Sequence, residues 1–225
     1  NQIEEHKACV IEASERRKRY NFFEATSITN TSVVDPRLPA LYVEIDKLIG
    51  IDGPKMDIIE WLTAETKDSS KELKVLSLVG CGGIGKTTLA NQVYRSVKSQ
   101  FSCAAFVSVS RNPDIKKILR DMAKGLGITD NTLDYDEQQL INKLREHLMN
   151  KRYLLVVDVW DAKPWETIKL PLVNENCGSR IIPTTRSIAV ASCLSSESNN
   201  VYKMKPLSFD DSRRLLFKRA FGSEN

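Results

Sequence analysis

Histidine is scarce in this 225-residue chain, which contains only His6 and His147. Zinc sites in proteins are built mainly from histidine and cysteine, so a zinc site would have almost no ligands here. The five cysteines form no Cys-x-x-Cys pair, and an odd count argues against a disulfide framework, so we expect free thiols in a reducing compartment. These cysteines lie at least sixteen positions apart: Cys9, Cys81, Cys103, Cys177 and Cys193.

Long apolar runs and a strong charge of one sign are also missing. No run approaches the ~20 apolar residues of a membrane-spanning helix. The 33 Lys and Arg against 29 Asp and Glu leave a formal net charge of +4, which is weak evidence for a nucleic-acid partner. Hydrophobic residues at 41% and charged residues at 28% indicate a folded globular chain. The chain begins at Asn1 without a signal-peptide pattern, so we expect an internal fragment of a larger protein.

The first 45 residues differ in texture from the rest. Residues 1–20 are rich in Glu, Lys and Arg and are typical of a helix end, whose basic run at 15–20 could be solvated or could contact nucleic acid or a membrane. Residues 21–45 combine small polar residues with Pro36 and Pro39 and lack apolar periodicity, which predicts a linker. A domain boundary is therefore expected there, with a second domain over 46–225.

Short apolar runs alternate with longer amphipathic stretches from residue 46 onward. This alternation predicts an α/β fold, a mostly parallel sheet with helices on both faces. The run 153–157 does not alternate, which indicates a strand buried on both sides. The other predicted strands are 73–79, 104–109, 180–182 and 201–204, and the predicted helices are 115–124, 136–150 and 209–221, with a further helix after the glycine-rich turn.

The glycine-rich segment 80–87 reads Gly-Cys-Gly-Gly-Ile-Gly-Lys-Thr and fits the pattern G-x-x-x-x-G-K-[ST]. Its glycines let the backbone curl around a diphosphate, and the helix that follows presents the positive end of its dipole. In this pattern Lys86 meets the β- and γ-phosphates, and the Thr87 hydroxyl binds Mg²⁺. A predicted strand precedes the segment and a predicted helix follows it, so we expect a phosphate loop.

A phosphate loop needs an acid for the magnesium ion, usually at the end of a buried strand. Asp158 follows the apolar run 153–157 and suits this role, although an acid at a strand end can also cap a turn. The patterns G-x-S-x-G, H-E-x-x-H and G-x-G-x-x-G are absent from the sequence. Three aromatic residues could stack on bases in principle, but their positions favour the core: Tyr94, Phe101 and Phe106.

Taken together, these blocks resemble the NB-ARC nucleotide-binding module of plant coiled-coil disease-resistance proteins, a P-loop NTPase fold of the STAND type. Residues 12–20 are similar to the end of the family's coiled-coil domain. The ordered blocks that carry the resemblance are 79–90 (the phosphate loop), 101–110, 154–161 (the magnesium acid), 178–186 (the sensor strand) and 202–221.

The resemblance implies an intracellular immune receptor, cytoplasmic and at times peripheral at the plasma membrane, that acts as an ADP/ATP switch with Mg²⁺. Exchange of ADP for ATP would release it to oligomerise and signal cell death. Its partners would be its own coiled-coil and leucine-rich-repeat domains, further copies of itself, and a pathogen effector or guarded host protein. Arg186 would sense the γ-phosphate, Thr87 and Asp158 would hold the metal, and Ile49 and Gly50 would meet the adenine. The remaining nucleotide-binding roles would fall on Gly80, Gly82, Gly83, Ile84, Gly85, Lys86 and Thr88.

The sequence departs from the family pattern at three points. The family usually has two consecutive acids where this chain has Asp158 followed by Val159, so hydrolysis is in question. Pro183 lies within the predicted sensor strand, so we expect the strand to break before Thr184 and to displace Arg186. The family's later blocks are not found before residue 225, so truncation ahead of the ARC subdomains is expected. Two functions stay open, a slowly hydrolysing signalling ATPase and a receptor module with nucleotide as a structural ligand, and a metabolic kinase is a more remote third.

Overall fold

The computed structural model describes residues 38–64, 71–110, 112–129, 132–159, 162–194 and 200–222 of the chain. The predicted end of a coiled-coil domain (1–20) and most of the predicted linker (21–45) lie outside these residues. Within them, no helix is both long enough and apolar enough to cross a membrane.

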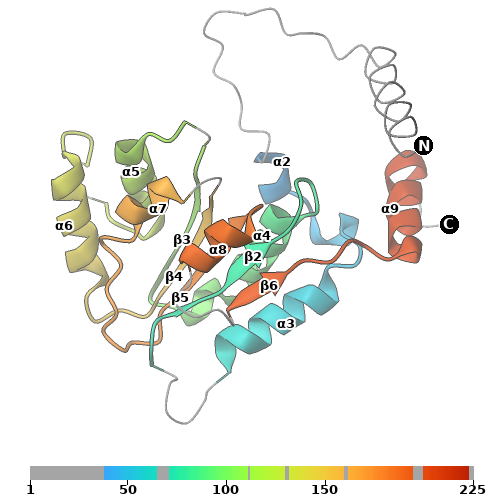
Figure 1. Ribbon diagram of the computed structural model, residues 1–225, viewed down its shortest axis with the longest axis horizontal. Coiled ribbons are helices and arrows are strands. Elements are labelled where there is room, and N and C mark those ends of the chain that lie inside the picture. The colour runs from blue at the N-terminus through green and yellow to red at the C-terminus, as the bar shows by residue number, and fades with distance from the viewer. Residues whose placement is uncertain are drawn as a thin grey trace, which may run out of the picture. The chain divides into compact units, whose positions relative to one another are not determined.

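A parallel β-sheet lies at the centre of the described part of the chain (Figure 1). Its strands are arranged in the order β3-β4-β5-β2-β6, and the short strand β1 also pairs with β5. All of the recorded strand pairs are parallel, which confirms the predicted fold class. The strands are β1 (Lys74–Val75), β2 (Ser77–Val79), β3 (Cys103–Ser108), β4 (Tyr153–Asp158), β5 (Arg180–Thr185) and β6 (Val201–Lys203).

Helices cover both faces of this sheet (Figure 1), as its buried strands require. Leu154 and Val156 of β4 pack in one apolar cluster with residues of α3 and α4. Leu155 and Val157 pack in a second cluster, with residues of α5, α6 and α7. Successive strand residues point to opposite faces, so Asp158 follows Val156 on the α4 face. The helices are α2 (Leu38–Leu41), η1 (Ile45–Lys47), α3 (Asp52–Thr63), α4 (Lys86–Val97), η2 (Lys98–Gln100), α5 (Ile115–Gly125), α6 (Glu137–Leu148), α7 (Lys163–Ile168), α8 (Ile188–Leu194) and α9 (Phe209–Phe221).

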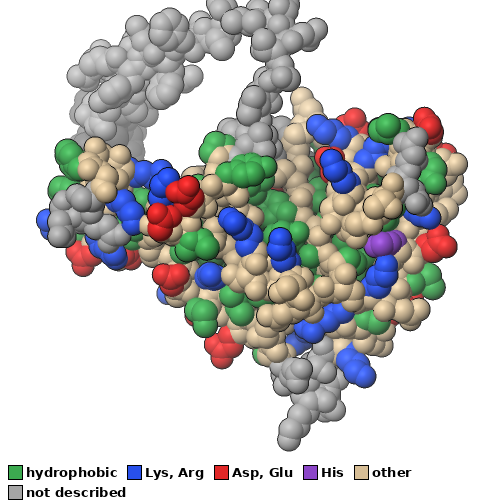
Figure 2. Space-filling model, turned by 180° about the vertical axis from the view of Figure 1, so that it is seen from behind, with side chains coloured by type: hydrophobic (Ala, Val, Ile, Leu, Met, Phe, Trp, Pro, Cys, Tyr) green, Lys and Arg blue, Asp and Glu red, His purple; other side chains and the backbone are tan. Residues whose placement is uncertain are grey.

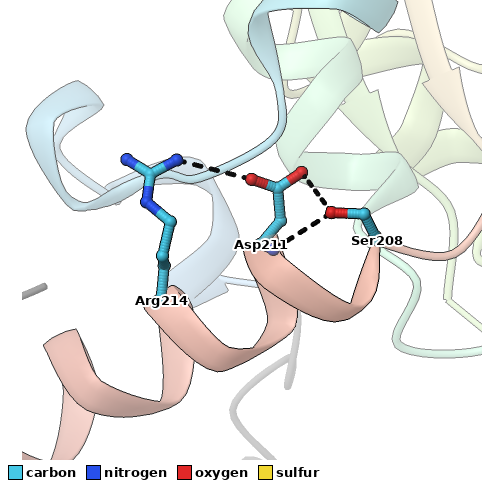
Figure 3. Close-up of polar contacts among 3 residues, drawn as sticks. All are labelled: Ser208, Asp211 and Arg214. Atoms are coloured by element: carbon cyan, nitrogen blue, oxygen red, sulfur yellow. Dashed lines mark hydrogen bonds and ion pairs between the residues drawn. The ribbon is translucent and has the colours of Figure 1, made fainter. Parts of the chain in front are cut away.

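Side-chain caps fix where two of the predicted helices begin. Asp136 precedes α6 and accepts from the backbone N–H of Gln139 at 2.7 Å, while the Gln139 side chain accepts from the backbone N–H of Asp136 at 2.9 Å. Ser208 precedes α9, accepts from the backbone N–H of Asp211 at 3.0 Å and donates to its carboxylate at 2.9 Å (Figure 3). Arg214 donates to the same carboxylate at 3.4 Å. Both helices therefore start where the sequence placed them.

The expectation that Pro183 breaks the strand before Thr184 is wrong. β5 runs through Pro183 without interruption and keeps its pairing with β4. Proline lacks a backbone N–H. On the side of β5 that faces β1 and β2, Leu76 and Ser77 have no register partner in β5, because they lie between the two short strands. The missing donor falls at this gap, so β5 stays intact, whereas the predicted strand 73–79 forms two short strands.

The last residues of the predicted linker have regular structure. Helix α2 contacts α4, and the side-chain nitrogen of Asn91 in α4 donates to the carbonyl of Leu41 at 2.8 Å. Residues 38–41 are thereby attached to the helix that follows the phosphate loop. The boundary at residues 45–46 stays a prediction.

Charged side chains of both signs occur on the face of the molecule seen from behind in Figure 2, where Lys and Arg are interspersed with Asp and Glu. This mixture agrees with the small formal net charge of +4. Charges of mixed sign are typical of a solvated surface.

Candidate nucleotide-binding site

The predicted phosphate loop connects β2 to the first turn of α4. Gly83 and Gly85 have φ values of +79° and +102°, which residues with a Cβ atom rarely adopt. The backbone N–H of Leu89 donates to the carbonyl of Gly85 at 2.8 Å, so helical hydrogen bonding begins at Gly85. The first N–H groups of α4 have no intrahelical acceptor, and a helix end of this kind favours an anion.

Lys86 is the first residue of α4, and its side chain folds back over the loop. Its ammonium donates to the carbonyls of Gly80 and Cys81, both at 2.8 Å. Burial lowers the pKa of Lys86 from its usual value, the charge of Arg186 lowers it further, and the carboxylate of Asp158 acts in the opposite direction. The ammonium is therefore held at the loop, next to a second cation, where a phosphate would compensate both charges.

Asp158 and Thr87, the predicted metal-binding pair, are in direct contact. The Thr87 hydroxyl donates to Asp158 Oδ2 at 2.7 Å, and the Thr184 hydroxyl donates to Asp158 Oδ1 at 2.6 Å. The backbone carbonyl of Asp158 accepts from the N–H of Val109 at 3.0 Å. Asp158 as a whole is only 6% exposed, so these hydrogen bonds, and not contacts with solvent, set the position of its carboxylate.

Arg186 follows β5 and lies against the phosphate loop. A Cβ atom added to Gly82 would be 3.1 Å from Arg186 Cζ and 3.3 Å from Nη1. The guanidinium therefore packs over the loop at a point where only glycine leaves this much room. Since β5 continues through Pro183, the predicted displacement of Arg186 away from the loop does not occur.

These side chains surround a cavity of about 290 Å³ at the carboxyl ends of β4 and β5. Asp158 is the one carboxylate among the described residues that line it. Gly80 and Gly82 lie beside this cavity, in contact with Lys86 and Arg186. The predicted site residues in the lining are Gly83, Gly85, Lys86, Thr87, Thr88, Asp158 and Arg186.

A second cavity of about 340 Å³ adjoins the first, because Gly83, Gly85 and Thr88 line both. Ile49 and Gly50, the residues predicted to meet the adenine, line this second cavity together with Ile84, and most of its other residues are apolar. Gly50 has a φ of +69°, and a Cβ atom there would be 2.6 Å from Leu207 Cδ2. The segment just before α9 thus packs directly against Gly50. The first cavity is lined mainly by charged and hydroxyl side chains, and the second, which adjoins it, mainly by apolar ones.

The residues present fit a magnesium ion. Mg²⁺ prefers oxygen ligands and is usually bound through one or two protein groups together with substrate phosphates. The Thr87 hydroxyl and the Asp158 carboxylate supply two such oxygens beside the phosphate loop. Among the described residues, no group of three or more His, Cys, Asp and Glu side chains could hold a metal ion by itself. Asp161, an acid three positions after Asp158 in the sequence, lies outside the described residues.

Several residues at the site were not predicted from the sequence. Thr184 contacts Asp158, and Ala40 of α2 lines the first cavity. Leu207, Leu215 and Arg219, around α9, line the second. The Thr-Thr-Arg run at 184–186 was a partial signal for Thr184, because it marks the end of a strand, but the sequence does not show that this strand lies next to the acid strand. The sequence holds no comparable signal for α2 and α9, which reach the site only through packing.

Comparison with known proteins identifies the family. The model of the NB-ARC domain matches residues 52–225, which include the phosphate loop, the acid strand and the sensor strand. The chain belongs to the NB-ARC family. Two relatives are the disease resistance protein RGA5 of Oryza sativa subsp. japonica, 35% identical over 99% of this chain, and the ToMV resistant protein Tm-2 netted virescent of Solanum lycopersicum, 33% identical over 100%. The chain spans only 20% and 26% of the lengths of these relatives.

Solved structures resemble this NB-ARC chain in fold alone. Cdc6p from Pyrobaculum aerophilum has a TM-score of 0.57 at 16% identity, covering 90% of this chain and 53% of that one. The ADP form of the Aeropyrum pernix ORC2 protein has a TM-score of 0.61 at 14% identity, covering 80% of this chain and 55% of that one. Both likenesses support the parallel α/β architecture of the described residues.

Proposed function

We propose that this NB-ARC chain binds ADP or ATP together with Mg²⁺ and acts as the nucleotide switch of a plant immune receptor. The observation that supports the proposal most strongly is the junction of the two cavities at the start of α4. One compartment offers Lys86, Arg186 and a helix N-terminus for phosphates, and the other offers apolar walls for a base. A nucleoside phosphate needs both kinds of compartment side by side.

In this proposal the phosphates lie against the loop at Gly83 and Gly85. Lys86 exchanges its two carbonyl partners for phosphate oxygens, which restores its favourable charge environment. Thr87 and Asp158 would hold the magnesium ion, which would neutralise part of the negative charge of the phosphates. Arg186, already at the loop, contacts the γ-phosphate and so distinguishes ATP from ADP.

Slow hydrolysis or none is the form of the switch that the site supports. Val159 takes the place next to Asp158, is 2% exposed, and packs in the apolar cluster of α5, α6 and α7. No second carboxylate is available among the described lining residues to orient water. Phosphoryl transfer depends on such positioning, so nucleotide exchange rather than turnover would set the state of the switch.

The wider role follows from the relatives and is part of the proposal. RGA5 and Pik-2 are named as disease resistance proteins and Tm-2 netted virescent as a ToMV resistant protein, and this chain corresponds to a fraction of each. We infer that it works within a cytoplasmic receptor with coiled-coil and leucine-rich-repeat domains, which oligomerises after ATP exchange and responds to a pathogen effector or a guarded host protein.

Nucleotide titration tests the proposal directly. Isothermal titration with ADP and with ATP, each with Mg²⁺ and with EDTA, should show binding of both nucleotides and a gain from the metal for ATP. Single-turnover phosphate release on the same protein should be slow compared with nucleotide exchange. Absence of binding in all four titrations would contradict the proposed function. Rapid phosphate release would reject only the proposal that hydrolysis is slow or absent, and nucleotide binding would stand.

A further inference from the structure

Thr184 is a buried polar residue at the end of β5. Thr184 is 0% exposed, and it lies opposite Asp158 in the pairing of β4 with β5. Its hydroxyl donates to Asp158 Oδ1 at 2.6 Å, and its carbonyl accepts from the N–H of Val159 at 2.9 Å. Thr184 of β5 therefore hydrogen-bonds both to the side chain of Asp158 and to the backbone that follows it at the end of β4.

The two carboxylate oxygens of Asp158 face different partners. Oδ1 meets Thr184 inside the sheet, and Oδ2 meets Thr87 beside the cavity. A carboxylate at a strand end can rotate about its side-chain torsions, and a hydrogen bond to one oxygen fixes which way the other points. Asp158 is the one carboxylate among the described lining residues, so its orientation decides where a cation meets the protein.

We propose that Thr184 is a positioning residue for the metal-binding carboxylate. Its hydroxyl holds Asp158 Oδ1 so that Oδ2 is presented, next to Thr87, to a divalent cation that arrives with the nucleotide phosphates. The inference rests on the proposed function, because it requires a nucleotide and its metal to enter this cavity. Removal of a group that orients a metal ligand typically weakens metal affinity by about 10–100-fold.

Variants that differ by a single hydroxyl isolate this role. Thr184→Val keeps the shape of the residue without the hydroxyl, and Thr184→Ser and Thr184→Ala form a pair that differs only in the hydroxyl. The measurement is the ATP dissociation constant of the full chain over a range of free Mg²⁺ and in EDTA. Ser77→Ala is the matched control, since it removes a buried hydroxyl of β2 that donates to Ala191 instead.

We expect Thr184→Val and Thr184→Ala to need about 10–100-fold more Mg²⁺ to reach half of the increase in ATP affinity that the metal produces. Their ATP affinity in EDTA should stay close to that of the parent. Thr184→Ser and Ser77→Ala should keep the parental Mg²⁺ midpoint. If Thr184→Val fails to fold, the Ser and Ala pair decides.

Equal Mg²⁺ midpoints for the Ser and Ala variants would overturn the inference. An ATP affinity that falls as much in EDTA as in Mg²⁺ would also overturn it, because that result indicates a purely structural role. A parent that binds ATP equally well with and without Mg²⁺ would reject the inference while leaving nucleotide binding in place. A parent that binds no nucleotide would instead reject the proposed function, and the inference with it.

Discussion

Lys86, Thr87, Asp158 and Arg186 come from three separate stretches of the sequence, and their side chains line one cavity. Lys86 is held by two loop carbonyls, and Asp158 is held by the hydroxyls of Thr87 and Thr184. Groups that are already in place lose less conformational entropy when a ligand binds. At the residue scale, the site is therefore preorganised for phosphate and metal.

Gly82→Ala should weaken the preference for ATP over ADP. The φ of Gly82 is not in the left-handed region, so the backbone accepts alanine, but the new methyl would press on the guanidinium of Arg186 at 3.1 Å. Loss of one hydrogen bond between charged groups costs about 1.5–3 kcal/mol, so the ATP-to-ADP affinity ratio should fall at least tenfold, roughly. Gly53→Ala, which meets no neighbouring atom within 4 Å, is the control. An unchanged ATP-to-ADP affinity ratio, even if both affinities fall, would refute the proposed role of Arg186.

At the scale of the elements, the sequence predicted what local pattern determines and missed what packing determines. The loop, the strand before Asp158 and the start of α9 follow from spacing and capping residues, and the structure has all three. The prediction for Pro183 was wrong because one sequence does not show the order of the strands. That order decides which neighbouring strand faces the missing N–H donor. Thr184 escaped notice for the same reason, since its contact with Asp158 depends on the register of two strands.

An Asp inserted between Asp158 and Val159 should accelerate ATP hydrolysis. Replacement of Val159 itself would bury a carboxylate in an apolar cluster, whereas insertion adds the acid that the family pattern has. A positioned base typically changes rate by ~10²–10⁴-fold, while ADP affinity should change little because ADP has no γ-phosphate. No replacement of Pro183 is needed, because Arg186 is already at the loop.

The control for this insertion is an Asn at the same point, which lengthens the chain without a carboxylate. Single-turnover phosphate release should be faster for the Asp insertion than for the Asn insertion and the parent. Equal rates for the two insertions would mean that the missing acid does not limit turnover.

For the molecule as a whole, the polar cavity lies where ligands of open α/β sheets bind, beyond the carboxyl ends of the strands. The loop follows β2, Asp158 ends β4 and Arg186 follows β5, and these three strands are contiguous in the order β4-β5-β2. A ligand there contacts elements that pack on both apolar clusters. Nucleotide binding should therefore stabilise the whole described fold and not a single loop.

Thermal unfolding with and without ADP and Mg²⁺, compared between the parent and Lys86→Ala, tests the central claim most directly. At a ligand concentration of about 100 times the dissociation constant, binding adds about 2.7 kcal/mol. For a domain of this size that corresponds to a rise in Tm of roughly 5–10 °C. Lys98→Ala removes an exposed lysine at the other end of α4 and serves as the control. We predict the full rise for the parent and for Lys98→Ala, and almost none for Lys86→Ala with its ligand-free Tm largely retained; a parental rise in Lys86→Ala would contradict the assignment of the phosphate loop.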